Sequence, residues 1–221
     1  MFLGHFGVAF GSKRIVPTVS LGTLILAAQL LDLAWPVLLL LGVEHVRIDP
    51  GNTAFTPLDF YDYPITHSLL LVLIWSLLFG GVYYGLRRGW KGAVLVGCAV
   101  LSHWILDFLT HRPDLPLSPW GQSFAGLGLW NSVPATLLVE WTIFIVGVFL
   151  YAFSTRPIDR TGRYAFWGLV AFLVLSSIAS MAGVPPNVDA IAYTSLFLWL
   201  LVPWGYWIDR HRQPVSRPPT A

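Results

Sequence analysis

The sequence predicts an all-α polytopic membrane protein with about six transmembrane helices and an N-terminal half-helix. Of the 221 residues, 56% are hydrophobic and 11% are charged, whereas soluble domains carry roughly 25% charged residues. The mean hydropathy is +0.68, and the apolar residues gather in runs close to the ~20 residues that a helix needs to cross a bilayer. A net charge of +2 without a basic stripe gives no nucleic-acid-binding surface.

The first element is an apolar segment, residues 1–12, which is too short to cross a hydrocarbon core of about 30 Å and is predicted to form a half-helix. Lys13 and Arg14 separate it from the first span, which holds Gln29, Asp32 and Pro36 and in which we expect a bend near the outer third. This span is too long for a signal-peptide core, and Leu26 stands where cleavage requires a small residue. The six predicted spans are residues 16–43, 65–86, 91–110, 132–153, 163–183 and 190–208.

The positive residues indicate an orientation. All of the 13 Lys and Arg residues except Arg47 and Arg112 lie before span 1, between spans 2 and 3, between spans 4 and 5, or after span 6. The positive-inside rule therefore predicts that both termini are cytoplasmic. The loops predicted on the outer side are residues 44–64, 111–131 and 184–189, and the first two are long enough to act as lids. We expect a single transmembrane domain over residues 1–211 and a disordered, Pro-rich tail over residues 212–221.

Three ionisable residues recur at intervals of four near the end of the third span: His103, Asp107 and His111. On a helix of 3.6 residues per turn they lie one above another on the same face. Ionisable side chains in an apolar helix are energetically expensive and mark functional sites, although a polar contact between helices is the alternative explanation. Two imidazoles and a carboxylate in register indicate a metal site.

Other ionisable residues are predicted at a similar depth. At 1.5 Å per helical residue, Asp32, His67 and Glu140 share the outer half of the membrane with this trio. His5 reaches only about 12 Å from the cytoplasmic face if residues 1–12 re-enter from that side, which is lower than the others. The predicted metal ligands are His5, Asp32, His67, His103, Asp107, His111 and Glu140.

These residue types suit a divalent cation. Imidazole and carboxylate are the usual ligands of zinc, and they also bind manganese or iron. Seven candidates exceed the needs of one tetrahedral ion, so we expect two or three ions, or one ion and a general base. Asp107 is well placed to bridge two ions, and Asp32, Asp107 and Glu140 are the candidate catalytic carboxylates. Arg112 either binds a phosphate or lipid headgroup through its planar guanidinium or is a surface charge.

In this order the residues resemble a family of bacterial inner-membrane proteins described as metal-dependent hydrolases. Its members begin with an N-terminal His, continue with an Asp in the first helix and a Thr-His-Ser, and later carry His-x-x-x-Asp. The matches here are His5, Asp32, Thr66-His67-Ser68 and His103-x-x-x-Asp107, and the resemblance covers most of residues 1–145. It implies a metal-dependent hydrolase in the bacterial inner (cytoplasmic) membrane.

The order of the ligands is also similar to that of zinc-dependent phospholipase C and the single-strand nucleases that share its fold. Those enzymes use an N-terminal amine and a His, then an Asp, a His, a His-x-x-x-Asp, another His and a late carboxylate. This resemblance implies that the seven candidates hold two or three zinc ions. Thr136 stands where those enzymes place a second His before the late carboxylate, here Glu140, so two ions fit as well as three.

Residues and resemblance together predict the hydrolysis of a phosphoester or lipid-like ester by metal-activated water. The expected partners are the lipid bilayer and a small-molecule or lipid phosphoester substrate. Two alternatives stay open at this point. A transporter or ion-permeation protein would use the same residues as an intramembrane cation or proton site, with a polar track continuing to the cytoplasmic side. A membrane di-iron oxidoreductase would carry more histidines in short motifs.

Overall fold

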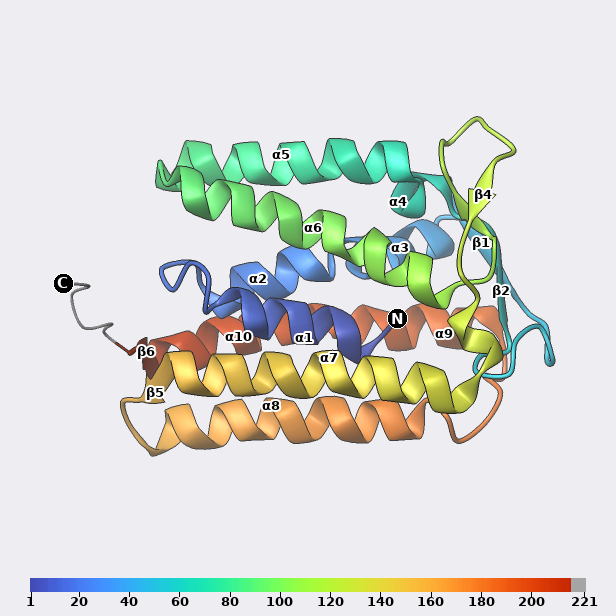
Figure 1. Ribbon diagram of the computed structural model, residues 1–221. Helices are drawn as coiled ribbons and strands as arrows, with labels where there is room; N and C mark the ends of the chain where they lie inside the picture. The colour runs from blue at the N-terminus through green and yellow to red at the C-terminus, as the bar shows by residue number, and fades with distance from the viewer. Residues whose placement is uncertain (216–221) are drawn as a thin grey trace.

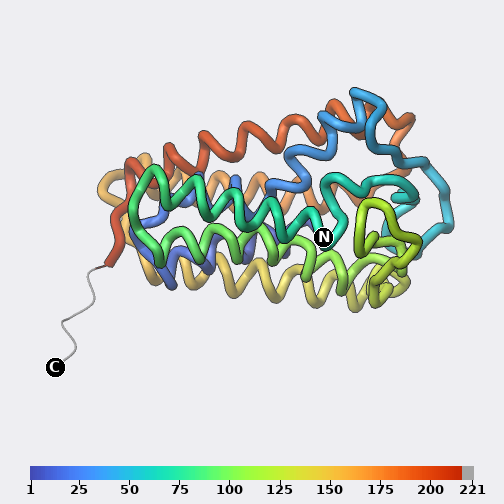
Figure 2. The backbone as a smooth tube through the Cα atoms, turned by 90° about the horizontal axis from the view of Figure 1, so that it is seen from above, coloured from blue at the N-terminus to red at the C-terminus, as the bar shows by residue number. Residues whose placement is uncertain are grey.

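The computed structural model describes residues 1–215, which form an elongated helical bundle with short strands at both ends (Figures 1 and 2). Within these described residues, five helices are long and apolar enough to cross a membrane, and one bent pair makes a sixth span if its halves are counted together. The predicted all-α polytopic membrane fold is therefore confirmed. The helices are α1 (Leu3–Ser12), α2 (Leu21–Ala28), α3 (Leu30–Leu40), α4 (Pro64–His67), α5 (Leu69–Arg87), α6 (Trp90–Thr110), α7 (Val133–Ser154), α8 (Arg160–Ala179), α9 (Val188–Leu196) and α10 (Leu201–Arg210), with 3₁₀ turns η1 (Leu129–Asn131) and η2 (Phe197–Leu200).

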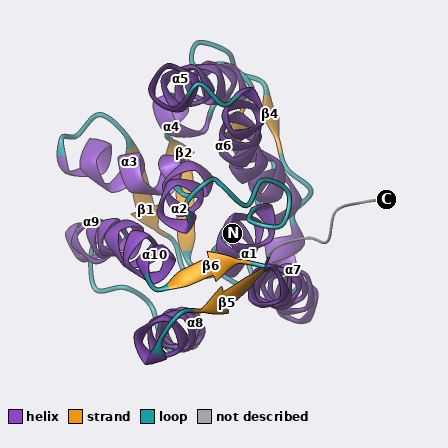
Figure 3. Ribbon diagram, turned by 90° about the vertical axis from the view of Figure 1, so that its left-hand side faces the viewer, coloured by secondary structure: helices purple, strands orange, loops and turns teal. Residues whose placement is uncertain are grey.

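The short helix α1 lies inside the bundle, against α2, α6 and α7 (Figure 3). Nearly all of its residues are buried. It packs so closely on α7 that the two backbones touch, because a Cβ on Gly147 would collide with the carbonyl of Gly7. Small residues at such a crossing permit this approach between membrane helices. The predicted half-helix is thus a core element, and its N-terminal end lies well inside the bundle (Figure 1).

The bend in the first predicted span lies at Gln29, near the middle of the span and not in its outer third. Helices α2 and α3 meet at an angle of 55°, and Gln29 between them has φ −106° and ψ 6°. The last carbonyls of a helix lack intrahelical partners, and here the carbonyl of Ala28 accepts a hydrogen bond of 2.7 Å from His103 Nδ1. The predicted bend is therefore confirmed, but its position differs, because Pro36 is accommodated inside α3, whereas the freed carbonyl of Ala28 is stabilised by a buried imidazole.

Helices α5 and α6 form a hairpin that turns through Arg88 in the left-handed conformation (φ 55°). Along α5, Val72 alone is buried, and the other apolar side chains remain at least partly exposed. Helix α6 is buried along one face, which includes His103 and Asp107. An apolar helix that packs on one side suits contact with lipid on the others. Of this hairpin, α6 supplies the site residues and α5 faces outward (Figure 3).

The two long loops predicted on the outer side fold into hairpins at one end of the bundle (Figure 1). Strand β1 (His45–Ile48) pairs antiparallel with β2 (Leu58–Asp62), and β3 (Leu115–Pro116) pairs with β4 (Phe124–Ala125). A hydrogen bond of 3.0 Å from the amide of Phe55 to the carbonyl of Trp130 joins the two loops. They form a roof over this end, and which side of the membrane it faces stays a prediction.

Part of the predicted C-terminal tail is ordered. Strand β6 (Arg212–Pro214) pairs with β5 (Thr155–Pro157) at the opposite end of the bundle. The guanidinium of Arg212 donates to Thr155 Oγ1 at 3.0 Å and lies 4.8 Å from the centre of the Phe166 ring. These contacts overcome the effect of the prolines, so the prediction of disorder was wrong for residues 212–214. Residues 216–221 of the predicted tail lie outside the described residues.

Candidate metal centre

The structure brings together five of the seven predicted ligands, contributed by four helices. They form two overlapping groups, and within each group the candidate ligand atoms lie within 4.8 Å of one another. All are buried except Asp32, whose side chain is 28% exposed. The groups are His5, His103 and Asp107, from α1 and α6, and Asp32, His67 and His103, from α3, α4 and α6.

Asp107 belongs to the first group and also faces the second, with one carboxylate oxygen toward each. Its Oδ1 is 3.1 Å from His5 Nε2 and accepts a hydrogen bond of 2.6 Å from the amino group of Met1. Its Oδ2 is 3.2 Å from His103 Nε2 and 3.7 Å from His67 Nε2. The amino group, which the resemblance implies as a ligand, therefore reaches the site. The two sides of one carboxylate face different partners, as a bridging ligand requires.

Two imidazoles are oriented by acceptors behind them. A carbonyl can only accept, so the contact of His103 Nδ1 with Ala28 places the proton on Nδ1 and leaves Nε2 unprotonated in the neutral ring. His103 Nε2 is buried without a hydrogen-bond partner among residues 1–215, although it faces Asp107 Oδ2 and Asp32 Oδ1, at 3.5 Å from the latter. His67 Nδ1 lies 2.6 Å from Thr66 Oγ1, and its Nε2 is 3.8 Å from Asp32 Oδ1. The Nε2 atoms of His67 and His103 thus face the carboxylate oxygens of Asp32 and Asp107.

His5 lies at the level of the other ligands. Its ring stacks on that of His103 with centroids 3.6 Å apart and an interplanar angle of 6°. The expectation that His5 would lie one or two turns lower was wrong, because α1 penetrates the bundle and reaches the site with its first turn. Apolar composition alone does not show how far a half-helix penetrates.

Glu140 lines the same cavity but is outside both groups in the part of the chain that the structure describes. Its Oε2 accepts hydrogen bonds from the amides of Phe2, at 3.1 Å, and Leu3, at 2.9 Å. Amides at a helix start lack intrahelical acceptors, so this carboxylate of α7 holds the start of α1. It therefore positions the helix that carries His5.

His111 also lines the cavity outside both groups, within the described residues. Helix α6 ends at Thr110, and His111 is its extended C-cap, so it does not continue the helical face that its spacing predicted. Its Nδ1 lies 2.9 Å from Asp114 Oδ1, to which the hydroxyl of Tyr63 donates at 3.2 Å. Burial lowers the pKa of His111 and raises the pKa of Tyr63 well above its usual value. A neutral His111 that donates from Nδ1 keeps Nε2 free to accept a proton.

Arg112 and Thr136 are placed elsewhere. The guanidinium of Arg112 pairs with Asp59 and, at 3.1 Å through Nε, with Asp114. The hydroxyl of Thr136 donates to backbone carbonyls, at 2.8 Å in the case of Leu129. The predicted headgroup-binding Arg112 therefore ties β2 to the segment after α6.

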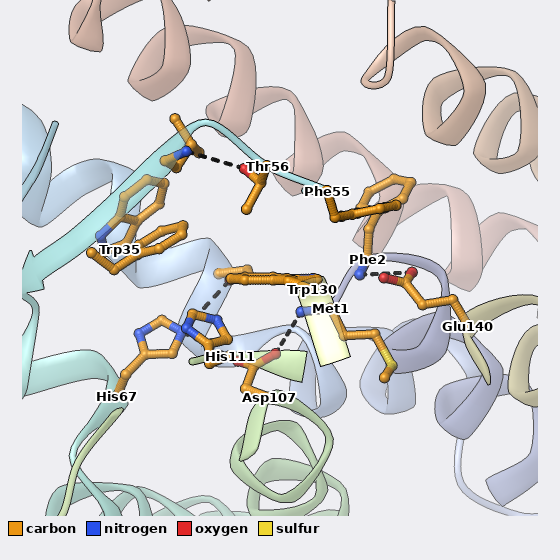
Figure 4. Close-up of a pocket in the computed structure, with 13 residues that line it drawn as sticks. Met1, Phe2, Trp35, Phe55, Thr56, His67, Asp107, His111, Trp130 and Glu140 are labelled. Carbon is orange, nitrogen blue, oxygen red and sulfur yellow. Dashed lines mark hydrogen bonds and ion pairs between the residues drawn. The ribbon is translucent and has the colours of Figure 1, made fainter. Parts of the chain in front are cut away.

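The cavity above the ligands has a volume of about 190 Å³. Asp32, His67 and Asp107 line it, and in Figure 4 the side chains of His67 and Asp107 lie across the cavity from the rings of Trp35 and Phe55. The aromatic residues of the lining are Phe2, Trp35, Phe55, Phe60 and Trp130. Among the described residues, no Lys or Arg side chain lines it. The arrangement is an acidic and imidazole floor beneath an apolar roof.

Sequence reasoning missed Glu44 and Tyr63, and it placed Asp114 beside the site without recognising its pairing with His111. Glu44 follows the first span and resembles an ordinary loop acid, yet it is fully buried and accepts hydrogen bonds from Thr66. Asp114 lies three residues after His111, a spacing that could have indicated a carboxylate–imidazole pair. The burial of Tyr63 has no signal in a single sequence.

A roofed cavity over buried imidazoles and carboxylates, inside a bundle of membrane-length helices, defines an integral membrane protein with a candidate metal-binding site. The chain belongs to the YdjM inner membrane protein family, whose model matches residues 6–184. No curated protein and no solved structure matches the chain.

Proposed function

We propose that this protein is a membrane-embedded, metal-dependent hydrolase that acts on a phosphoester, or a related ester, with an apolar substituent. The observation that supports it best is the placement of Asp107 between two ligand groups, with one oxygen toward His5 and the other toward His103 and His67. The proposal extends the family assignment from a membrane protein to an enzyme.

The donor chemistry fits a divalent cation. The unprotonated Nε2 atoms of His67 and His103 and the oxygens of Asp32 and Asp107 are all electron-pair donors. Burying such atoms face to face is costly unless a cation lies between them. Zinc takes four ligands of these types, and manganese or iron accepts them as well. The single lone pair of His103 Nε2 can serve one ion, together with Asp32, His67 and Asp107 Oδ2. A second ion would be held by the groups around Asp107 Oδ1, which are His5 and the amino group of Met1.

A pair of bound cations would supply a water of lowered pKa as nucleophile and would neutralise charge on the phosphoryl group. The chain's own residues have distinct tasks in this proposal. Asp107 holds the two ligand groups in register, and Asp32, the most exposed of the carboxylates, accepts a proton from the attacking water. His111 transfers a proton through Nε2 while Asp114 holds its Nδ1–H. Glu140 keeps α1, and hence His5, in place.

The cavity supports a substrate with an anionic and an apolar part. No described Lys or Arg side chain lines it, and the amino group of Met1 is already paired with Asp107, so bound cations would neutralise negative charge on a ligand. The rings of Trp35, Phe60 and Trp130 offer apolar surface on the other side. Small-molecule sites commonly combine an apolar lining with a few placed polar groups. A phosphoester of an aryl, alkyl or lipid-like group suits both sides.

The packing of α1 argues against a transport path. Beyond His5, toward the far end of the bundle, Phe6, Ala9 and Phe10 are completely buried. Phe10 packs edge-on against Phe144, at 6.1 Å between ring centroids. An apolar core there interrupts a polar track of the kind that a transporter requires.

The arrangement of the histidines argues against a membrane di-iron oxidoreductase. Such enzymes carry several histidines in short motifs, whereas the two ligand groups here share His103.

The test is metal-dependent hydrolysis of an aryl phosphoester by detergent-purified protein. We expect turnover with zinc or manganese, and a loss of more than roughly 100-fold in His103→Ala and Asp107→Ala, beyond the 10–100-fold that outer-shell changes cost. His45→Ala is the matched control, because His45 pairs with Asp62 on the outer hairpin, outside both groups. Turnover that survives chelation, or that both variants retain, would contradict the proposal.

A further inference from the structure

A second carboxylate stands behind His67. Glu44 lies just beyond the end of α3 and is completely buried. Its Oε1 accepts hydrogen bonds from the amides of Ile65, at 2.7 Å, and Thr66, at 2.8 Å. Its Oε2 accepts a third, of 2.7 Å, from the Thr66 hydroxyl. Three donors thus converge on an acid that lines neither the cavity nor a ligand group within the described residues.

These contacts set the direction of hydrogen bonding as far as His67. The Thr66 hydroxyl has a single proton and donates it to Glu44. Its oxygen, 2.6 Å from His67 Nδ1, can therefore only accept from that nitrogen. The ring proton then lies on Nδ1, and the lone pair of Nε2 points toward Asp32 and Asp107.

We propose that Glu44 is a positioning residue that acts through Thr66 to hold His67 in the tautomer with an unprotonated Nε2. The inference rests on the proposed metal centre, for which His67 supplies a ligand. Partners of this outer kind fix the tautomer and orientation of a ligating imidazole. For His103 the same task is performed by a backbone carbonyl, which no substitution can remove. His67 is the ligand whose tautomer depends on exchangeable side chains.

The substitution Glu44→Gln reverses this direction with little change in size. The amides of Ile65 and Thr66 require an acceptor, so the glutamine oxygen takes the place of Oε1. The NH₂ group then occupies the place of Oε2 and donates to Thr66 Oγ1. Thr66 must turn its proton to His67 Nδ1, which moves the ring proton to Nε2. Nε2–H cannot ligate a cation.

The direct measurement is the histidine tautomer in metal-free, full-length protein labelled with ¹⁵N-histidine, read by two-bond ¹H–¹⁵N NMR in detergent. We expect the proton on Nδ1 of His67 in the wild type and in Thr66→Ser, and on Nε2 in Glu44→Gln. The signal of His103 is the internal reference and stays unchanged. A wild-type His67 protonated on Nε2, or a tautomer that Glu44→Gln leaves unchanged, would overturn the proposal.

Zinc affinity gives the second readout. We expect Glu44→Gln and Thr66→Val to weaken zinc binding roughly 10–100-fold, and Thr66→Ser to retain wild-type affinity. Should Glu44 serve only to hold the loop, Glu44→Gln would lower the melting temperature and leave the zinc affinity intact, which would overturn the proposal. If the wild type bound no zinc, the proposed hydrolase would fail, while the NMR measurement on metal-free protein would still decide the role of Glu44.

Discussion

At the scale of single residues, the site depends on which atoms are left without a proton. Ala28 and Thr66 accept from the Nδ1 atoms of His103 and His67, and both Nε2 atoms then face carboxylates. Asp107 meets both ligand groups because its two oxygens have different neighbours. Carboxylates outside this arrangement, such as Glu140, serve the backbone instead. The chemistry of each acid follows from its hydrogen-bond partners more than from its depth.

Glu140 tests this distinction between a ligand and a positioning residue. Glu140→Gln keeps an oxygen that can accept from the amides of Phe2 and Leu3, so we expect zinc stoichiometry and melting temperature close to those of the wild type. Glu140→Ala leaves both amides without this acceptor, at a cost of ~1–3 kcal/mol for each buried group, and the melting temperature falls. Loss of one zinc equivalent in Glu140→Gln would instead make Glu140 a ligand.

At the scale of elements, the unusual component is α1. A buried helix of ten residues supplies His5 and packs on α7 through the contact between Gly7 and Gly147. The roof is the other short element of the site. It consists of the β1–β2 and β3–β4 hairpins, whose loops meet through a hydrogen bond between Phe55 and Trp130. Both elements are short, and both depend on tertiary contacts more than on their own hydrogen bonds. The site is therefore completed by segments too short to span the membrane, although α6 supplies His103 and Asp107.

Displacing α1 should remove metal binding without touching a ligand. We expect Gly147→Leu to lower the melting temperature and the zinc stoichiometry together, because the new side chain meets the backbone of Gly7 and overpacking typically costs ~1–3 kcal/mol. Gly81→Leu, on α5, is the matched control, since a Cβ there meets nothing within 4 Å. Full zinc binding in Gly147→Leu would show that the position of α1 is not needed.

At the scale of the whole molecule, the helices were predictable and the joints between them were not. Apolar runs locate membrane-length helices because the bilayer sets their length. The break at Gln29, the strand at Arg212 and the buried Glu44 each depend on a partner far away in the sequence: His103, Phe166 and Thr66 respectively. A single sequence does not contain such pairings.

The candidate site divides in the same way. The interval of four between His103 and Asp107 on one helix predicts their shared face, which α6 confirms. For His111 the same interval failed, because α6 ends one residue earlier and the imidazole turns to Asp114. His5 was placed too low because burial of α1 between other helices leaves no mark in its composition. The spacing of residues predicts a shared helical face only within the helix, and His111 lies one residue beyond the end of α6.

A carboxylate that joins two cation sites sets the number of ions bound, which calorimetric titration of detergent-purified full-length protein with zinc measures. We predict two equivalents for the wild type, one for His5→Ala and none bound tightly by Asp107→Ala. His5→Ala removes the imidazole beside Asp107 Oδ1, whereas Asp107→Ala removes the carboxylate that faces both sites. His211→Ala, which alters a contact with Asp159 and no candidate ligand, retains both equivalents. A wild type that binds no zinc, or an Asp107→Ala variant that binds as much as the wild type, would contradict the account.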